Sequence, residues 1–162
     1  LYDNFGSGIM APMSGVMLQN RGQGFVVDAA HPNGVAPGKR PLHTLIPGMV
    51  TKDGRVTMSY GVMGGEYQAF GHMQFLTRHF DYEMDVQMAQ DMPRFFPDPF
   101  DDFVEVEAPV PDDVRTALRH LGHDIRPASK PIGGSQAISI DWETGLLTAG
   151  SDPRKDGCAM GY

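Results

Sequence analysis

Apolar and polar residues alternate most regularly at positions 56–60, where Met58 and Tyr60 are separated by a hydroxyl residue. This period of two predicts a strand with one apolar and one polar face. An apolar run at 45–50 precedes the strand, and Asp53-Gly54 between the two runs favours a tight hairpin turn. We therefore expect a hairpin, and we expect the face carrying Val56, Met58 and Tyr60 to associate where nothing covers it.

The rest of the chain shows fewer periods but clear element ends. Apolar spacing typical of helices predicts two of them, at 66–80 and 83–92, the second stopped by Pro93. Acidic residues after Pro111 start another helix, which Gly122 ends. Further predictions are strands at 15–19 and 103–107, a hairpin from 137 to 149, and loops at 1–10, 28–41 and 95–102. Because strands and helices are segregated along the chain, the predicted fold class is α+β with an antiparallel sheet, in a single domain over residues 1–162.

Composition limits the classes of function. The 162 residues are 41% hydrophobic and include nine Phe and five Tyr, enough for a folded domain with a core. A formal net charge of −7 repels nucleic-acid phosphates and anionic lipid headgroups. No apolar run approaches the roughly 18 residues that span a bilayer, and no leader of charged and then apolar residues opens the chain. We expect neither a nucleic acid nor a membrane as partner.

Metal and thiol chemistry find little support in the sequence. The single cysteine, Cys158, excludes an internal disulfide and a Cys-based zinc site, which slightly favours a cytoplasmic over a periplasmic location. Among the six histidines, neither His120 with His123 nor His72 with His79 has the spacing of zinc ligands. We predict no metal and no other cofactor. A metal hydrolase that uses the histidines is an alternative, which bound zinc in elemental analysis would reveal.

An acidic segment overlaps the loop expected at 95–102. It lacks the alternating Asp/Asn and glycine pattern of a calcium loop, so we interpret it as a solvated face. Its members are Asp98, Asp101, Asp102, Glu105 and Glu107.

Two adjacent glycines, Gly64 and Gly65, lie between the strand at 56–60 and the helix predicted from 66. Glycine allows a positive φ and a close approach, and the first N–H groups of a helix have no partner inside it, so an anion fits there. The segment 61–65 matches neither a phosphate-binding loop nor a dinucleotide fingerprint. The pair is therefore either a structural turn or a site for an anion or oxyanion.

Short segments in a fixed order add context to this pair. They are Phe5-Gly6-Ser7-Gly8-Ile9, residues 15–20, Pro32-Asn33, residues 37–41, Gly64-Gly65, Pro93-Arg94-Phe95, Gly134-Ser135-Gln136-Ala137-Ile138 and Ser151-Asp152-Pro153-Arg154 followed by the C-terminus. With these segments the chain resembles the γ-glutamyltransferase (glutathione hydrolase) family, in its small catalytic subunit, over essentially its whole length. The resemblance is nearest to the branch of glutaryl acylases and oxamate amidohydrolases.

The resemblance implies an N-terminal nucleophile hydrolase with an αββα sandwich of antiparallel sheets. Such an enzyme is a zymogen that cuts itself into a large and a small subunit, and the new N-terminal threonine becomes the nucleophile with its own α-amino group as base. Leu1 lies downstream of where that threonine is expected, so we expect the nucleophile and the large subunit to lie outside this chain and the chain alone to be inactive. Gly64 and Gly65 match the family's oxyanion pair, a role worth about 3 kcal/mol for each N–H donor.

Other positions depart from the family pattern. Where glutathione-cleaving members hold the γ-glutamyl α-amino group, this chain has Tyr2, Arg21 and Gly24, and a guanidinium cannot accept a hydrogen bond from an ammonium. The serine pair that holds the α-carboxylate matches His43-Thr44, of which Thr44 keeps a hydroxyl. We therefore expect an acyl group without the amine, such as a glutaryl amide or an oxamate-like monoamide, its carboxylate met by Arg21 or Thr44. The alternative is that Arg21 merely pairs with a neighbouring acid.

The leading functional hypothesis is an amidohydrolase or acyltransferase that cleaves a small-molecule γ-glutamyl or related dicarboxylic amide through a threonyl acyl-enzyme. Water is the favoured acceptor if the amine clamp is absent. The large subunit of the same proenzyme is the expected partner, and a homo-oligomer is possible. The alternative is a non-catalytic relative that binds small anions or a partner chain, and N-terminal sequencing of the native protein would distinguish the two.

Overall fold

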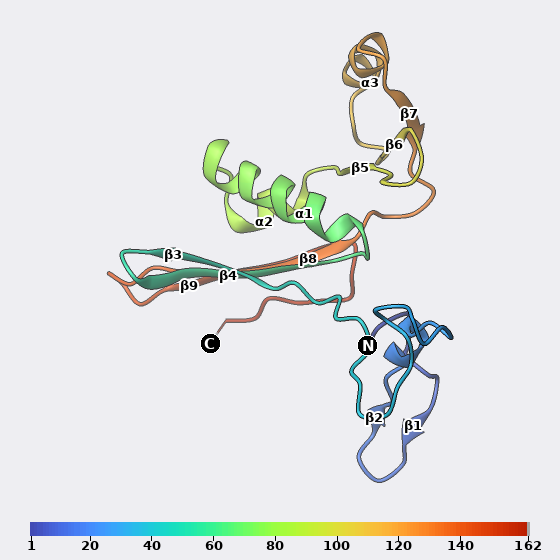
Figure 1. Cartoon of the computed structure of the whole chain (residues 1–162). Helices are drawn as coiled ribbons and strands as arrows, with labels where there is room; N and C mark the ends of the chain where they lie inside the picture. Colours follow the sequence, from blue (N-terminus) through green and yellow to red (C-terminus); the bar gives the residue numbers. More distant parts are fainter. Residues whose placement is uncertain (162) are drawn as a thin grey trace. The chain divides into compact units, whose positions relative to one another are not determined.

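A computed structural model describes residues 1–161 of the chain, which divides into two compact units, 1–45 and 46–161 (Figure 1). The single domain over 1–162 stays a prediction. No helix among the described residues has the length and apolar character needed to cross a membrane.

The first unit is built mainly from turns. The strand β1 (Met10–Ala11) pairs antiparallel with β2 (Val16–Met17), and the short 3-10 helix η1 (Arg21–Gly24) follows. The strand predicted at 15–19 is thus confirmed in a shorter form. Its partner β1 begins at Met10, the last residue of the segment predicted as a loop at 1–10. The sequence prediction missed this short strand because it forms only by pairing with β2 across the turn. Most large apolar side chains of this unit are exposed.

A four-stranded antiparallel sheet forms the body of the second unit. Its order is β3 (Gly48–Lys52), β4 (Arg55–Met63), β8 (Gly134–Ile140) and β9 (Leu147–Ser151). Both predicted hairpins are confirmed. The tight β3–β4 turn has positive φ at both central residues, 52° at Asp53 and 76° at Gly54, as such turns require.

Two helices, α1 (Tyr67–Leu76) and α2 (Val86–Asp91), cover one face of this sheet (Figure 1). The core between them joins Met58 and Ala137 of the sheet to Phe75 of α1, with Tyr60 packed against it. The chain's own helices therefore cover Met58 and Tyr60, so this part of the apolar face is not left open, and association of the fragment stays a prediction.

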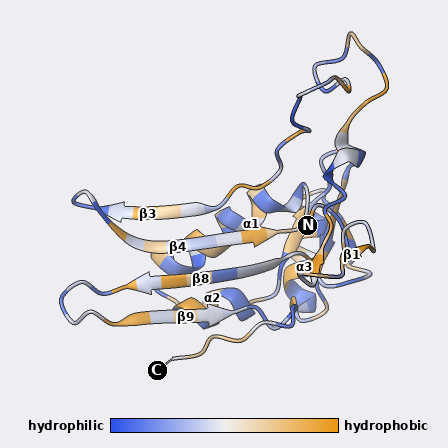
Figure 2. Ribbon diagram, turned by 90° about the horizontal axis from the view of Figure 1, so that it is seen from below, coloured by the Kyte–Doolittle hydropathy of each residue, from blue (hydrophilic) through white to orange (hydrophobic). Residues whose placement is uncertain are grey.

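The opposite face of the same sheet carries exposed apolar side chains. Figure 2 marks hydrophobic positions along all four strands of this sheet. Each of the four strands contributes one of these side chains. They lie on this face because successive residues of a strand point to opposite faces of the sheet, and their neighbours along the strand face the helices. They are Met49, Met63, Ile138 and Leu147.

The helix boundaries differ from the sequence prediction at two ends. The helix predicted to 80 changes at residue 77 into a π-helical turn, η2 (Thr77–Asp81). The helix predicted from 83 begins only at Val86, because Glu83 has a positive φ of 55° and the Asp85 side chain caps the helix by accepting from the amide of Met88 at 2.7 Å.

A smaller three-stranded sheet extends from the second unit. Its order is β5 (Phe95–Pro97), β6 (Phe103–Val106) and β7 (Asp124–Pro127), with α3 (Asp112–His120) joining β6 to β7. The predicted strand at 103–107 and the predicted third helix are confirmed. The prediction of a loop throughout 95–102 is wrong at β5, an edge strand that accepts a proline, and β7 was not predicted. The β6–β7 pair is parallel, as a strand–helix–strand connection allows, whereas the other labelled strand pairs are antiparallel.

Candidate active site

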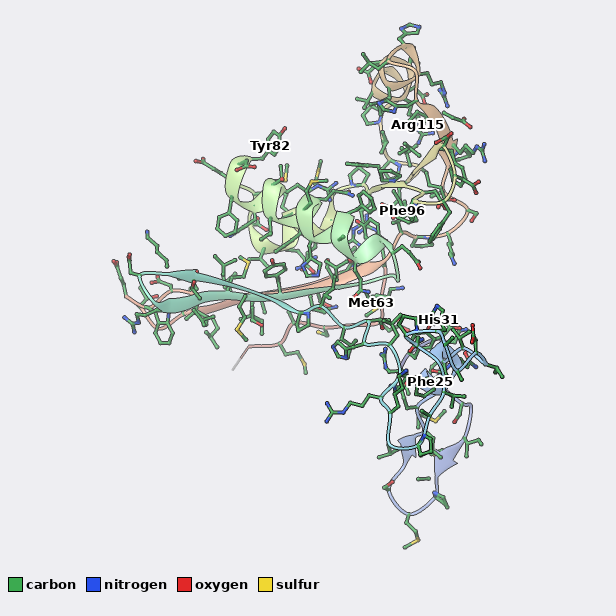
Figure 3. All side chains as sticks on the ribbon, viewed as in Figure 1. Phe25, His31, Met63, Tyr82, Phe96 and Arg115 are labelled. Atoms are coloured by element: carbon green, nitrogen blue, oxygen red, sulfur yellow. The ribbon has the colours of Figure 1, made fainter. Side chains whose placement is uncertain are left out.

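The Gly64-Gly65 turn connects the end of β4 to the start of α1, close to Met63 (Figure 3). The carbonyl oxygens of the two glycines accept hydrogen bonds from the amides of Tyr67 at 3.2 Å and Gln68 at 3.1 Å. Within residues 46–161, neither glycine amide donates a hydrogen bond, and both glycines are exposed. The turn therefore presents two N–H groups beside the positive end of a helix, where an anion is stabilised.

The two glycines are required for different reasons. Gly64 has a φ of 136°, and a side chain there would meet the Cα of Gly133 at 3.0 Å and the ring of Tyr67 at 3.2 Å. Gly65 has a φ of 61° but open space around it. Backbone conformation and packing both demand glycine at 64, whereas only the left-handed backbone favours it at 65.

The Tyr67 side chain packs against the turn at Gly64. Its ring lies against Gly133 and meets the ring of Phe96 edge to face, with 5.7 Å between the centroids. Burial raises the pKa of Tyr67 to about 12 despite the nearby Arg94 charge, so the phenol stays neutral. Its hydroxyl is buried and has no hydrogen-bond partner within residues 1–161.

The buried guanidinium of Arg94 lies near the Tyr67 ring. Arg94, only 3% exposed, donates to the carbonyl of Ile132 at 2.8 Å, to Oγ of Ser135 at 2.8 Å and to Oδ2 of Asp152 at 2.5 Å. Asp152 also accepts from the Ser135 amide at 2.8 Å. Burial alone would raise the pKa of Asp152, but the Arg154 amide and the charges of Arg94 and Arg154 outweigh it, and the pKa lies below its usual value.

A second buried pair adjoins the first. Arg154 donates to both carboxylate oxygens of Glu107, at 2.5 and 2.7 Å, and to Oδ1 of Asp152 at 3.2 Å. Glu107 also accepts from the amides of Arg94 at 2.8 Å and Ile132 at 3.0 Å. Burial opposes ionisation of Glu107, yet these donors hold its pKa below the usual value. Both carboxylates are therefore charged at neutral pH.

The assignment of Glu107 to a solvated acidic face is wrong, because the side chain is buried and paired with Arg154. Asp101 and Asp102 of the same segment are exposed. Sequence reasoning gave no role to Arg94, Ser135 or Asp152, although each lies in a segment that carries the family resemblance. The only local signal was a proline next to Arg94 and to Asp152, which does not reveal the partner of either side chain.

Three of the predicted substrate-binding residues meet in the first unit. Arg21 donates to Oγ1 of Thr44 at 2.7 Å, and its guanidinium carbon lies 5.1 Å from the centroid of the Tyr2 ring. Among residues 1–161 no carboxylate lies within ion-pair distance of Arg21, so the alternative of an ion pair with a neighbouring acid is not found. The Arg21 charge is held in place by a hydroxyl and an aromatic face without being neutralised.

The other two predicted residues do not join this cluster by side-chain contacts. Gly24 ends η1, and its carbonyl accepts from the side-chain amide of Asn33. His43 is exposed, next to Thr44 in the chain. Within residues 1–161, no group of three or more His, Cys, Asp or Glu side chains is arranged to hold a metal ion.

Residues 1–162 match the sequence family described as gamma-glutamyltranspeptidase. The chain is 38% identical over 169 residues to the glutathione hydrolase-like YwrD proenzyme of Bacillus subtilis, which covers 99% of the chain and 32% of that protein. It is 36% identical over 170 residues to the oxamate amidohydrolase proenzyme of Klebsiella pneumoniae, covering 100% of the chain and 32% of that protein. The chain thus spans about a third of the length of these curated relatives.

Solved structures give the same picture. The cephalosporin acylase from Bacillus halodurans superposes with a TM-score of 0.83 and 39% identity, over 99% of this chain and 31% of that one. The gamma-glutamyltranspeptidase from Pseudomonas nitroreducens complexed with L-DON superposes with a TM-score of 0.78 and 27% identity, over 98% of this chain and 88% of that one. The likeness therefore extends along nearly the whole of residues 1–162, and the α+β fold class is confirmed.

Proposed function

The chain belongs to the gamma-glutamyltranspeptidase family, and from this premise we propose that it is the small-subunit part of an amidohydrolase that cleaves a dicarboxylic monoamide through a threonyl acyl-enzyme. The resemblance drawn from the sequence segments is confirmed, including the branch, since oxamate amidohydrolase and cephalosporin acylase are among the relatives. One observation carries the proposed chemistry: the exposed Gly64-Gly65 turn, whose two amides have no acceptor within residues 46–161.

In the proposed reaction, the hydroxyl oxygen of a threonine outside this chain attacks the amide carbonyl while the threonine's α-amino group takes the proton. The carbonyl oxygen becomes an oxyanion, which accepts from the amides of Gly64 and Gly65. Collapse breaks the C–N bond, and the amine leaves with the proton. Water then attacks the ester and releases the free acid. Two preorganised donors contribute about 3 kcal/mol each to such a transition state.

The cluster around Arg21 supports a substrate acid without an α-amino group. A guanidinium that lacks a carboxylate partner and is fixed by Thr44 provides donors for a carboxylate and repels an ammonium. The proposed substrate therefore carries a carboxylate at one end and the scissile amide at the other. Glutaryl and oxamate-like monoamides have this form.

Turnover of matched anilides by the complete proenzyme after its cleavage tests this substrate class. We expect glutaryl p-nitroanilide to have a higher kcat/KM than γ-glutamyl p-nitroanilide, which differs by the α-amino group alone. A clear preference for the γ-glutamyl compound would reject the amine-free substrate. Failure to cleave either compound, together with no N-terminal threonine on sequencing of the native small chain, would favour the non-catalytic alternative.

The exposed apolar face of the four-stranded sheet supports a large subunit of the same proenzyme as partner. All four strands, β3, β4, β8 and β9, contribute to this face, which carries Met49, Met63, Ile138 and Leu147. We expect Ile138→Lys to reduce co-purification of the larger fragment with the small one. Leu121→Lys, an equal change at an exposed apolar residue outside the sheet, should leave it unchanged. Equal effects of the two variants would reject this face as the interface.

A further inference from the structure

We propose that Arg94 is a positioning residue for the Gly64-Gly65 turn, an inference that rests on the oxyanion role proposed for that turn. Arg94 does not lie in the turn, and its side chain is buried. It contacts both structures that support Gly64 from behind, which are the Ile132–Gly133 backbone and the ring of Tyr67. Its effect on the reaction would pass through these two supports.

The first support is the backbone segment that precedes β8. Arg94 donates to the carbonyl of Ile132 at 2.8 Å, and the amide of Ile132 is held in turn by Glu107 at 3.0 Å. The next residue, Gly133, has a φ of 62°, and its Cα is one of the atoms that limit the space at Gly64. Both polar groups of Ile132 are therefore fixed just before the chain touches the turn.

The second support is the first residue of α1. The Tyr67 amide donates to the carbonyl of Gly64 at 3.2 Å, so the position of Tyr67 sets the orientation of the turn. The guanidinium carbon of Arg94 lies 5.7 Å from the centroid of the Tyr67 ring. The Tyr67 hydroxyl has no partner within residues 1–161, which leaves packing and the contact with Arg94 to hold the ring.

Arg94 is itself fixed from two distant segments. Asp152, next to the end of β9, and Ser135, in β8, accept hydrogen bonds from its guanidinium, and Ser135 also donates to Oε1 of Gln90 at 3.1 Å. A planar guanidinium makes these bonds and the bond to Ile132 at the same time. A lysine ammonium keeps the charge but lacks the fork that spans the three acceptors.

The test compares Arg94→Lys with Arg115→Lys in the complete, cleaved enzyme. Arg115 also uses its guanidinium to hold backbone carbonyls, those of Glu107, Ala108 and Val110, but these lie in the segment leading to α3 (Figure 3). We expect Arg94→Lys to lower kcat about 10- to 100-fold, less than or comparable to losing one oxyanion donor, with KM within about threefold. Arg115→Lys should leave kcat within about twofold.

A measurement that does not need activity reads the turn directly. The amides of Tyr67 and Gln68 donate back into the turn, so their hydrogen-exchange rates report its geometry. In Arg94→Lys these rates should rise about tenfold more than the rate of the Gly145 amide, which is bonded to the Asp141 carbonyl in the β8–β9 turn. Equal changes at the three amides, or a kcat that stays within twofold, would overturn the positioning role.

Two further outcomes can be distinguished from failure of the positioning role. If the wild-type enzyme cleaves no amide, the proposed function fails while the exchange comparison still decides whether Arg94 holds the turn. If Arg94→Lys does not fold or is not cleaved, Ser135→Ala takes its place, because it keeps both charges and removes one acceptor of Arg94. It should shift kcat and the two exchange rates in the same direction by a smaller factor, and an unchanged turn in a folded Ser135→Ala protein would overturn the proposal.

Discussion

Two arginines, Arg94 and Arg21, use the same guanidinium in opposite ways. Arg94 is buried and has a carboxylate, a hydroxyl and a carbonyl as acceptors, so its charge is neutralised where it stands. Arg21 is fixed by Thr44 and the Tyr2 ring and has no carboxylate partner among residues 1–161. A fully paired guanidinium holds protein structure together, whereas a fixed but unpaired one has donors left for a ligand. The comparison predicts that changes near Arg94 alter stability and that changes at Arg21 alter binding.

The largest effect is expected from Asp152→Ala. This change leaves Arg94 buried and charged without its carboxylate, and breaking a buried pair in this way costs about 3–5 kcal/mol of unfolding free energy. The matched control is Asp124→Ala, which removes the partner of Arg126 at a similar distance of 2.7 Å, but with both side chains more than half exposed. That control should cost less than about 1 kcal/mol in urea denaturation of the complete protein. Similar costs for the two variants would remove the structural side of the comparison.

Arg21→Met should act on binding. We expect KM for a glutaryl amide to rise about 10- to 100-fold, since a hydrogen bond to a charged group contributes about 1.5–3 kcal/mol, with kcat and the melting temperature nearly unchanged. Methionine keeps much of the length of the side chain while removing the charge. A fall in melting temperature as large as that of Asp152→Ala, at constant KM, would show that Arg21 is structural and would erase the contrast between the two arginines.

The glycine pair allows a comparison within a single turn. Gly64→Ala places a side chain against Gly133 and Tyr67 at a φ of 136°, so it should lower stability by about 1–3 kcal/mol and shift the donors. Gly65→Ala meets open space at a φ of 61° and should cost about 1 kcal/mol. Thermal unfolding and kcat of both variants measure the difference. If Gly65→Ala were the more harmful variant in both measurements, the support at Gly133 and Tyr67 would not control the turn.

Local features explain which parts of this fold the sequence predicts. Asp53-Gly54 marks a hairpin by its own backbone preferences, and the acidic start and Gly122 mark α3. The strand β7 has no such signal, because its pairing with β6 depends on a register set across the intervening helix. The prolines near 95–102 indicate a loop, yet Pro97 is acceptable in β5, which lies at the edge of its sheet.

The candidate site divides in the same way. The turn at Gly64 and Gly65 is predictable because a strand end, two glycines and a helix start are neighbours in the chain, whereas the proposed roles of Arg21 and Thr44 rest on the family resemblance. The buried network is not predictable from local pattern, because Arg94 and Asp152 are 58 residues apart and Glu107 and Arg154 are 47 apart. An acid looks solvated until its distant partner is known.

The smallest predicted effect is on the pH dependence of stability. The histidine packed on the sheet core and the carboxylates of the buried network should lose their contributions to stability in different pH ranges. His72 on α1 lies against the Tyr60 ring, with 5.1 Å between the centroids, and burial lowers its pKa below the ordinary 6.5. Because the fold favours neutral His72, its contribution to stability is complete above about pH 6.5 and is lost as the pH falls from there through the lowered pKa. The carboxylates of Glu107 and Asp152 also have lowered pKa values, so their contribution is lost only at pH values below their ordinary 4.5 and 3.8. The unfolding free energy should therefore decline gently between pH 7 and pH 5 in the wild type and decline less in His72→Gln. A steeper decline in His72→Gln would contradict the assignment of this pH range to His72 in the sheet core.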